Sequence, residues 1–220
     1  MIADGSPQRK STTASVLADS LRNAIVDGSL TGGQPLRQDE IASRYGVSKI
    51  PVREALVQLQ SEGLVTFQPS RGAAVSILTP QQAEEIYVMR FALETTVLRR
   101  AIPQMDRQDF LEAEHLLRKI DDEDNPLRWG ELNWTFHQAL YKPANMPLLM
   151  DTLQKLWVNV TRYFVVYQAT AYRHKSQTEH HDILTACRAG NVDAASFYLE
   201  HHLRSAANNM IRHLKEQQTA

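Results

Sequence analysis

The sequence predicts a mainly α-helical protein with two domains: a small one that joins helices to a β-hairpin, and a larger all-α bundle of about six helices. Two observations predict this fold class. Short β-branched segments occur only before residue 78, where they flank a turn. Beyond it, apolar residues recur at helical spacing. We therefore expect a flexible arm at 1–11 and domains at 12–78 and 79–220, which suits a chain of 220 residues.

Composition excludes several classes of protein. Hydrophobic residues make up 43% of the chain and the net charge is −1, which is typical of a globular protein and not of a strongly basic one. The single cysteine, Cys187, excludes a disulfide framework and cysteine-rich zinc sites. No apolar run approaches the ~20 residues that a membrane span needs. The polar residues 1–11 do not resemble a signal peptide, so the expected location is cytoplasmic, with no membrane partner.

The first domain is expected to contain three helices and a two-stranded hairpin. The helices are predicted at 13–27, at 38–44 and after Ser48, with strands at 64–67 and 73–77. A turn is expected at 32–35, and Ser48 is the expected N-cap of the third helix. The apolar positions of that helix follow i, i+3, i+4, i+7 spacing and form one face: Val52, Ala55, Leu56 and Leu59.

This order of elements is that of a winged helix-turn-helix, whose second paired helix can enter the DNA major groove. Lys49 and Arg53 stand four residues apart, so they share the side of that helix opposite its apolar face. Arg71, beside Gly72 at the hairpin tip, could reach a phosphate or the minor groove. Further candidates for contacts with the DNA backbone lie near the second helix: Arg37, Gln38 and Arg44.

The charge of this domain leaves an alternative open. From Met1 through Leu78 the chain carries eight Lys and Arg against seven Asp and Glu, so DNA binding depends on where the charges lie and not on their number. The alternative is that Lys49 and Arg53 form an ordinary solvated helix face.

Residues 36–75, LRQDEIASRYGVSKIPVREALVQLQSEGLVTFQPSRGAAV, resemble the DNA-binding domain of the GntR family of transcription regulators. The motifs that carry the resemblance are GVS-x-x-PVREAL, then EGLV, then RG-x-x-V. The resemblance implies that Ser48, Lys49, Arg53, Arg71 and Gly72 belong to the DNA-binding surface. The family usually has Arg where Lys49 stands, and lysine lacks the planar fork with which arginine grips guanine. The operator is therefore expected to differ from that of relatives with Arg.

Six helices are predicted in the second domain, near 80–102, 106–122, 126–141, 147–170, 174–189 and 191–216. The expected caps include Thr79 with Pro80 after it, Asp106, Asn125 and Asn191, with Gly190 ending the fifth helix.

All eight histidines lie in this second domain. Asn133 and His137 are four residues apart and point to one side of their helix, while His180 and His202 lie on two later helices that could pack together. Neutral imidazoles from three helices plus one side-chain oxygen suit a divalent metal such as zinc or nickel. The alternative is that these are core histidines with hydrogen-bond partners. No HExxH motif occurs, so a zinc protease is not indicated.

Residues 80–215 resemble the FCD-type effector domain of the FadR subfamily of GntR regulators. The stretches that carry the resemblance are YVMRFALE (87–94), LNWTFHQALYKPANMPLL (132–149) and EHHDILTACRAGNVDAASFYLEHHLR (179–204). In that family an Asp and three His bind a metal, which implies Asn133, His137, His180 and His202 here. Asn133 replaces the Asp and brings no negative charge, so metal affinity should fall and attraction for an anion should rise.

These resemblances imply a bacterial DNA-binding regulator, most often a repressor, and not an enzyme. A homodimer on a pseudo-palindromic operator and control by a small organic acid are expected. Arg90 is the candidate for gripping the acid's carboxylate, with an intrahelical pair to Glu94 as the alternative. Two other functions stay open: a regulator that senses the metal itself, and a metal-dependent hydrolase fused to a DNA-binding domain. The hydrolase lacks a general base at a recognisable spacing.

Overall fold

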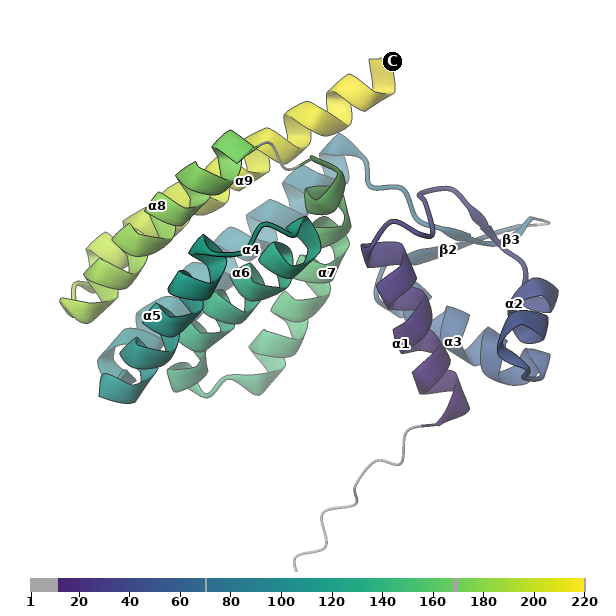
Figure 1. The fold of residues 1–220 in the computed structure, drawn as a ribbon, viewed down its shortest axis with the longest axis horizontal. Helices are drawn as coiled ribbons and strands as arrows, with labels where there is room; N and C mark the ends of the chain where they lie inside the picture. Colours follow the sequence, from purple (N-terminus) through teal and green to yellow (C-terminus); the bar gives the residue numbers. More distant parts are fainter. Residues whose placement is uncertain (1–11, 70, 168–169, 220) are drawn as a thin grey trace, which may run out of the picture. The chain divides into compact units, whose positions relative to one another are not determined.

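The computed structural model describes residues 12–69, 71–167 and 170–219, so the expected arm at 1–11 lies outside the described residues. The chain divides into two compact units, residues 1–77 and residues 78–220 (Figure 1). The mainly α-helical fold class is confirmed, and none of the described helices is long and apolar enough to cross a membrane.

The first unit has the element order of a winged helix-turn-helix. Its elements are α1 (Thr13–Val26), β1 (Pro35–Leu36), α2 (Gln38–Tyr45), α3 (Lys49–Ser61), β2 (Val65–Gln68) and β3 (Gly72–Val75). The apolar stripe of α3 is buried as its spacing predicts, and it packs against α1. At the end of α3, the carboxylate of Glu62 accepts two hydrogen bonds of 2.7 Å from the Arg22 guanidinium of α1. The recognition-helix candidate is therefore held at both its core face and its C-terminus.

The sheet of this unit has three strands and not the two predicted. The order is β1-β3-β2 and both pairings are antiparallel. The prediction treated residues 32–35 only as a turn, because a strand as short as β1 shows no alternation of apolar and polar residues. Two backbone hydrogen bonds beside β1 extend the pairing, from Gly33 N to the Val75 carbonyl and from Val75 N to the Gln34 carbonyl, each 2.9 Å long.

The expected cap by Ser48 is wrong in one respect. Ser48 stands at the N-cap position of α3 with an extended backbone, but its side chain makes no capping hydrogen bond. An N-cap hydroxyl bonds the backbone N–H of the second or third helical residue. Here the third is Pro51, which has no N–H to offer. The Ser48 hydroxyl is exposed at the start of the helix instead.

The second unit contains six α-helices among the described residues. They are α4 (Pro80–Ala101), α5 (Arg107–Asp121), α6 (Pro126–Tyr141), α7 (Pro147–Tyr167), α8 (Thr170–Arg188) and α9 (Val192–Thr219), with short 3-10 turns after α4 and α6. The long helix α9 packs against both α4 and α8, and α5 packs on α6 and α8 (Figure 1). Their apolar faces enclose one core.

The predicted N-cap residues stand at the helix starts of this unit and accept hydrogen bonds there. Thr79 and Gln82 form a capping box, with Pro80 in the first turn, and the Asp106 carboxylate accepts from the backbone of α5. Asn125 and Asn191 also accept from backbone N–H groups. Three boundaries differ from the prediction by three or four residues: α7 ends at Tyr167 and not at 170, α8 begins at Thr170 and not at 174, and α9 ends at Thr219 and not at 216. Neither Gly nor Pro occurs between residues 148 and 189, so no residue of these types marks the end of α7 or the start of α8.

We predict that Leu56→Ala lowers the free energy of unfolding of the first unit by about 2–5 kcal/mol, because Leu56 is fully buried and the truncation leaves a cavity. Val57→Ala, one position along the helix and 50% exposed, should change it by less than about 0.5 kcal/mol. Urea unfolding of both variants measures the difference. Equal losses would mean that α3 does not bury the predicted face.

Candidate functional site

Three of the sequence-predicted ligands come together inside the second unit. His137 on α6, His180 on α8 and His202 on α9 each place a ring nitrogen within 4.8 Å of those of the other two. All three side chains are buried. Their ring centroids lie 5.2 Å apart for His137 with His180, 5.2 Å for His137 with His202 and 4.6 Å for His180 with His202. We call this cluster the histidine triad.

Helical periodicity explains why these three helices point imidazoles inward. His137 lies on the buried side of α6, together with Asn133 one turn before it and Leu140 one turn after it, and its neighbour Phe136 is buried as well. His180 and His202 each occupy a buried position of their helix, beside apolar core residues such as Ile183 and Leu203. The second histidine of each adjacent pair, His181 or His201, points elsewhere and is more than half exposed. An adjacent pair on a helix is about 100° apart, so only one member can face the core.

Each ring of the triad has its Nδ1 within hydrogen-bond distance of a different side chain. The partners are the Tyr141 hydroxyl for His137 at 3.2 Å, Gln177 Oε1 for His180 at 3.0 Å and Glu179 Oε2 for His202 at 3.0 Å. Amide and carboxylate oxygens only accept, so His180 and His202 carry a proton on Nδ1. The Tyr141 hydroxyl donates its proton to Glu94 at 2.6 Å, so His137 must donate to it in turn.

The Nε2 atoms of His137 and His180 are buried and have no hydrogen-bond partner among the described residues. Burial lowers the pKa of both rings well below its ordinary value, and the nearby His202 lowers both further. The two rings are therefore neutral at neutral pH and present lone pairs on Nε2. Buried nitrogens without a partner are uncommon in folded proteins and indicate a missing partner.

Asn133 adds an oxygen to this set. It is buried one helical turn before His137, and its Oδ1 has no hydrogen-bond partner among the described residues. Neutral imidazole nitrogens together with an amide oxygen fit a divalent ion such as zinc or nickel. The residues present therefore fit the group that the sequence predicts, without the negative charge of an aspartate.

Arg90 lies in the same core and is 1% exposed. Its guanidinium carbon is 4.9 Å from the ring centroids of both Tyr87 and Trp157. The Arg90 Nε donates to Glu94 Oε1 at 2.7 Å, so Arg90 forms the intrahelical ion pair with Glu94 that the sequence offered as an alternative to ligand binding. Burial acts to lower the pKa of Arg90, but the charge and hydrogen bond of Glu94, together with the nearby Tyr87 and Tyr141, raise this pKa above its ordinary value. Nη1 has no hydrogen-bond partner among the described residues, which leaves one donor for a ligand.

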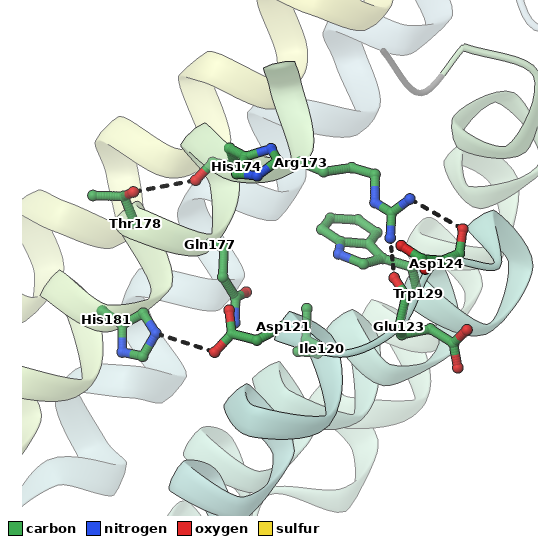
Figure 2. A pocket seen from close by; sticks show the side chains of 10 residues that line it. All are labelled: Ile120, Asp121, Glu123, Asp124, Trp129, Arg173, His174, Gln177, Thr178 and His181. Atoms are coloured by element: carbon green, nitrogen blue, oxygen red, sulfur yellow. Dashed lines mark hydrogen bonds and ion pairs between the residues drawn. The ribbon is translucent and has the colours of Figure 1, made fainter. Parts of the chain in front are cut away.

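A surface cleft of about 340 Å³ lies between α8 and the segment that joins α5 to α6 (Figure 2). Several of its charged side chains already have partners. Arg173 donates to the backbone carbonyls of Glu123 and Asp124, and His181 faces Asp121 at 3.7 Å. Gln177 lines the cleft and also accepts from His180, while its amide nitrogen donates to the Leu117 carbonyl at 3.0 Å.

Sequence reasoning missed the side chains that hold the triad: Glu94, Tyr141, Gln177 and Glu179. A partial signal existed for three of them. Tyr141 is four residues after His137 and Gln177 three before His180, which is the spacing of contacts on one helix face. Glu94 is four residues from Arg90. Glu179 reaches His202 across two helices, and no local pattern predicts that contact.

The candidate DNA-binding residues of the first unit are exposed, except for Gln38, which is half-buried. Lys49 pairs with Asp39 of α2 at 2.5 Å, whereas Arg53 has no hydrogen-bond or ion-pair partner within the part of the chain that the structure describes. Arg37 pairs with Glu40 at 3.1 Å, and Gln38 begins α2. Arg71 and Gly72 are exposed at the hairpin tip, where the backbone of Gly72 takes a φ of +79° that a side chain would strain.

Comparisons with known proteins agree with this architecture. Residues 13–75 match the gntR family of bacterial regulatory proteins and residues 85–205 match the FCD domain. The HTH-type transcriptional repressor RspR of Escherichia coli K12 is 29% identical over 207 residues, covering 90% of this chain and 88% of that protein. The structure of a GntR-family transcriptional regulator from Pseudomonas syringae is 32% identical in sequence, with a TM-score of 0.58. The match covers 94% of this chain and 88% of the Pseudomonas chain.

The Escherichia coli McbR/YncC structure is 25% identical with a TM-score of 0.79, and the match covers 95% of this chain and all of that one. These proteins are transcription regulators and not enzymes. The prediction of a transcription regulator is therefore confirmed, and the alternative of a metal-dependent hydrolase fused to a DNA-binding domain is not supported. The chain belongs to the GntR family of bacterial transcription regulators, and its second unit carries an FCD domain.

Proposed function

We propose that the protein is a repressor that binds a pseudo-palindromic DNA operator as a homodimer and reads bases with α3. The observation that carries this proposal is the exposed, unpartnered Arg53 guanidinium on the side of α3 opposite its buried stripe. An arginine in this position can make a bidentate contact to guanine in the major groove. Such a regulator works where the chromosome lies, which places it in the bacterial cytoplasm.

Lys49 and Ser48 complete this face in the proposal. The ion pair between Lys49 and Asp39 is exposed on both sides, and surface pairs of this kind contribute only about 0–1 kcal/mol. The Lys49 ammonium can therefore leave Asp39 and contact DNA with little loss of free energy. The Ser48 hydroxyl is not used in capping and is free to bond a phosphate. Arg37, Gln38, Arg71 and Gly72 would hold the DNA backbone on either side of α3.

The homodimer is supported by apolar side chains on two packed helices of the second unit. Val88 and Met89 of α4 and Phe197 and Tyr198 of α9 are between 38% and 66% exposed. Burying such residues against a second copy is favourable. Two copies related by a two-fold axis would present two α3 helices to successive major-groove faces about 34 Å apart, which is why the operator should be pseudo-palindromic.

The second unit is proposed to hold a divalent ion, zinc or nickel, through Asn133, His137, His180 and His202. The buried and unpartnered Nε2 and Oδ1 atoms support this. When bound, the ion would supply positive charge, since its four protein ligands are neutral. A small organic acid is the effector class that suits this charge, and the Nη1 of Arg90 is a donor for its carboxylate. Ligand binding would then change the affinity for the operator.

A regulator that responds to the metal alone is the second candidate. It is favoured by the deep burial of all three imidazoles, which restricts access to the triad. Operator release by zinc or nickel without any organic acid would identify it, whereas release that requires the acid would support the first candidate.

We predict that Arg53→Ala weakens specific operator binding by about 1–3 kcal/mol, because one base contact is lost. Operators selected from random DNA and a gel-shift assay at fixed salt measure this. Arg100→Ala, which removes one exposed positive charge from α4, is the matched control and should bind like the wild type. Unchanged binding by the Arg53 variant would contradict the assignment of α3 as the reading helix.

We predict that His180→Ala abolishes metal binding while operator binding is kept, since the histidine triad lies in the second unit. His181→Ala is the matched control, because the neighbouring ring is exposed. Elemental analysis of the purified variants, before and after treatment with a chelator, measures bound metal. Equal metal content in the two variants would exclude the triad as the binding site.

We predict that Asn133→Asp raises the affinity for zinc severalfold and lowers the affinity for an anionic effector, because the substitution adds one negative charge beside the ion. Calorimetric titration with the metal alone measures the first effect. No change in zinc affinity would mean that Asn133 does not contact the ion.

A further inference from the structure

We propose that Glu179 is a positioning residue for the metal centre and that it supplies, through His202, the negative charge that Asn133 does not bring. This inference rests on the proposed metal binding. The arrangement that carries it is a buried carboxylate that bridges α8 and α9 and directly contacts a triad ring.

Both oxygens of the Glu179 carboxylate are occupied. Oε2 accepts from Nδ1 of His202 at 3.0 Å, and Oε1 accepts from the Ser205 hydroxyl at 2.9 Å. The Glu179 side chain is 9% exposed and that of His202 is 4% exposed. The carboxylate cannot rotate without losing one of two bonds to α9. It therefore fixes the orientation of the His202 ring and keeps the proton on Nδ1, so that the Nε2 lone pair is free for a metal.

Among the described residues, the three triad rings have acceptors of different charge. His137 donates to a tyrosine hydroxyl and His180 to a glutamine amide, both neutral. Only His202 donates to a carboxylate. A hydrogen bond to a charged acceptor is about twice as strong as a neutral one and raises the basicity of the ring. His202 is therefore the one described triad ring whose direct acceptor is negatively charged, whereas Glu94 reaches His137 only through the Tyr141 hydroxyl and is itself paired with Arg90.

The other charges near Glu179 do not cancel this effect. Lys175 lies 3.8 Å and His201 3.4 Å from Oε1, but both side chains are more than half exposed, so water screens them. Arg90 and Glu94 form a buried pair that balances itself. A divalent ion with four neutral ligands would carry +2, and Glu179 lowers this to +1. That equals the charge of a centre with aspartate at position 133.

The test is zinc titration by calorimetry on the full chain. Glu179→Gln keeps an acceptor oxygen for His202 and removes only the charge, so zinc affinity should fall about 10–100-fold. Glu200→Gln is the matched control, because Glu200 is on α9, its side chain is 44% exposed and it pairs with Arg204. It should bind like the wild type. The double variant Asn133→Asp/Glu179→Gln should recover the wild-type affinity, since the lost charge returns at a ligand.

Ser205→Ala separates charge from orientation, because it removes the bond to Oε1 and leaves the carboxylate. It should weaken zinc binding less than Glu179→Gln does. The nitrogen NMR signals of the metal-free protein should show His202 protonated on Nδ1 in the wild type and in Ser205→Ala. Thermal unfolding of each metal-free variant checks that the fold is kept.

Each other outcome overturns the inference in a distinguishable way. Wild-type affinity in Glu179→Gln excludes any contribution of Glu179. An equal loss in Ser205→Ala, or no recovery in the double variant, means that orientation and not charge is what matters. A wild type that binds neither zinc nor nickel removes the proposed metal centre together with this inference.

Discussion

The second unit is organised by one constraint: a buried imidazole must give its single N–H to an acceptor. Three such rings meet in one core, and each obtains its acceptor from a helix position that would otherwise be apolar. The Tyr141 hydroxyl accepts a hydrogen bond from His137 and donates one to the carboxylate of Glu94, which also accepts one from Arg90. Removing one member leaves a neighbour buried without a partner, which costs more than the bond itself contributes. The packing of α4, α6, α8 and α9 is thereby specified by polar contacts as well as by apolar area.

The two units use charge in opposite ways. In the first unit the basic side chains of α3 are exposed, and Lys49 is held only by a surface pair that solvent weakens. In the second unit the charged groups Arg90, Glu94 and Glu179 are all buried, where each interaction is stronger and each unpaired group more costly. The first arrangement suits reversible contact with a polyanion such as DNA. The second suits a small ligand that must be recognised by a fixed set of atoms.

Features that depend on the spacing of residues close together in the chain could be predicted from the sequence. Helix caps such as Thr79 and Asp106 and the buried stripe of α3 follow from spacing alone. Spacing also requires that only one histidine of each adjacent pair faces inward, and the family resemblance implied that these are His180 and His202. Strand β1 is too short to show a period, and the start of α8 carries no boundary residue. The contact of Glu179 with His202 joins residues 23 positions apart. Such a contact depends on how two helices pack, which no single helix encodes.

The placement of the tryptophans has an optical consequence. All three indoles, Trp129, Trp134 and Trp157, belong to the second unit. Trp157 stacks on Trp134 with ring centroids 5.2 Å apart and lies 6.4 Å from the His137 ring. Intrinsic tryptophan emission therefore originates wholly outside the winged helix-turn-helix, and one emitter stands beside the triad. A change in the surroundings of that core would therefore alter the tryptophan emission of unlabelled protein, while changes confined to the first unit would leave the environment of all three indoles as it is.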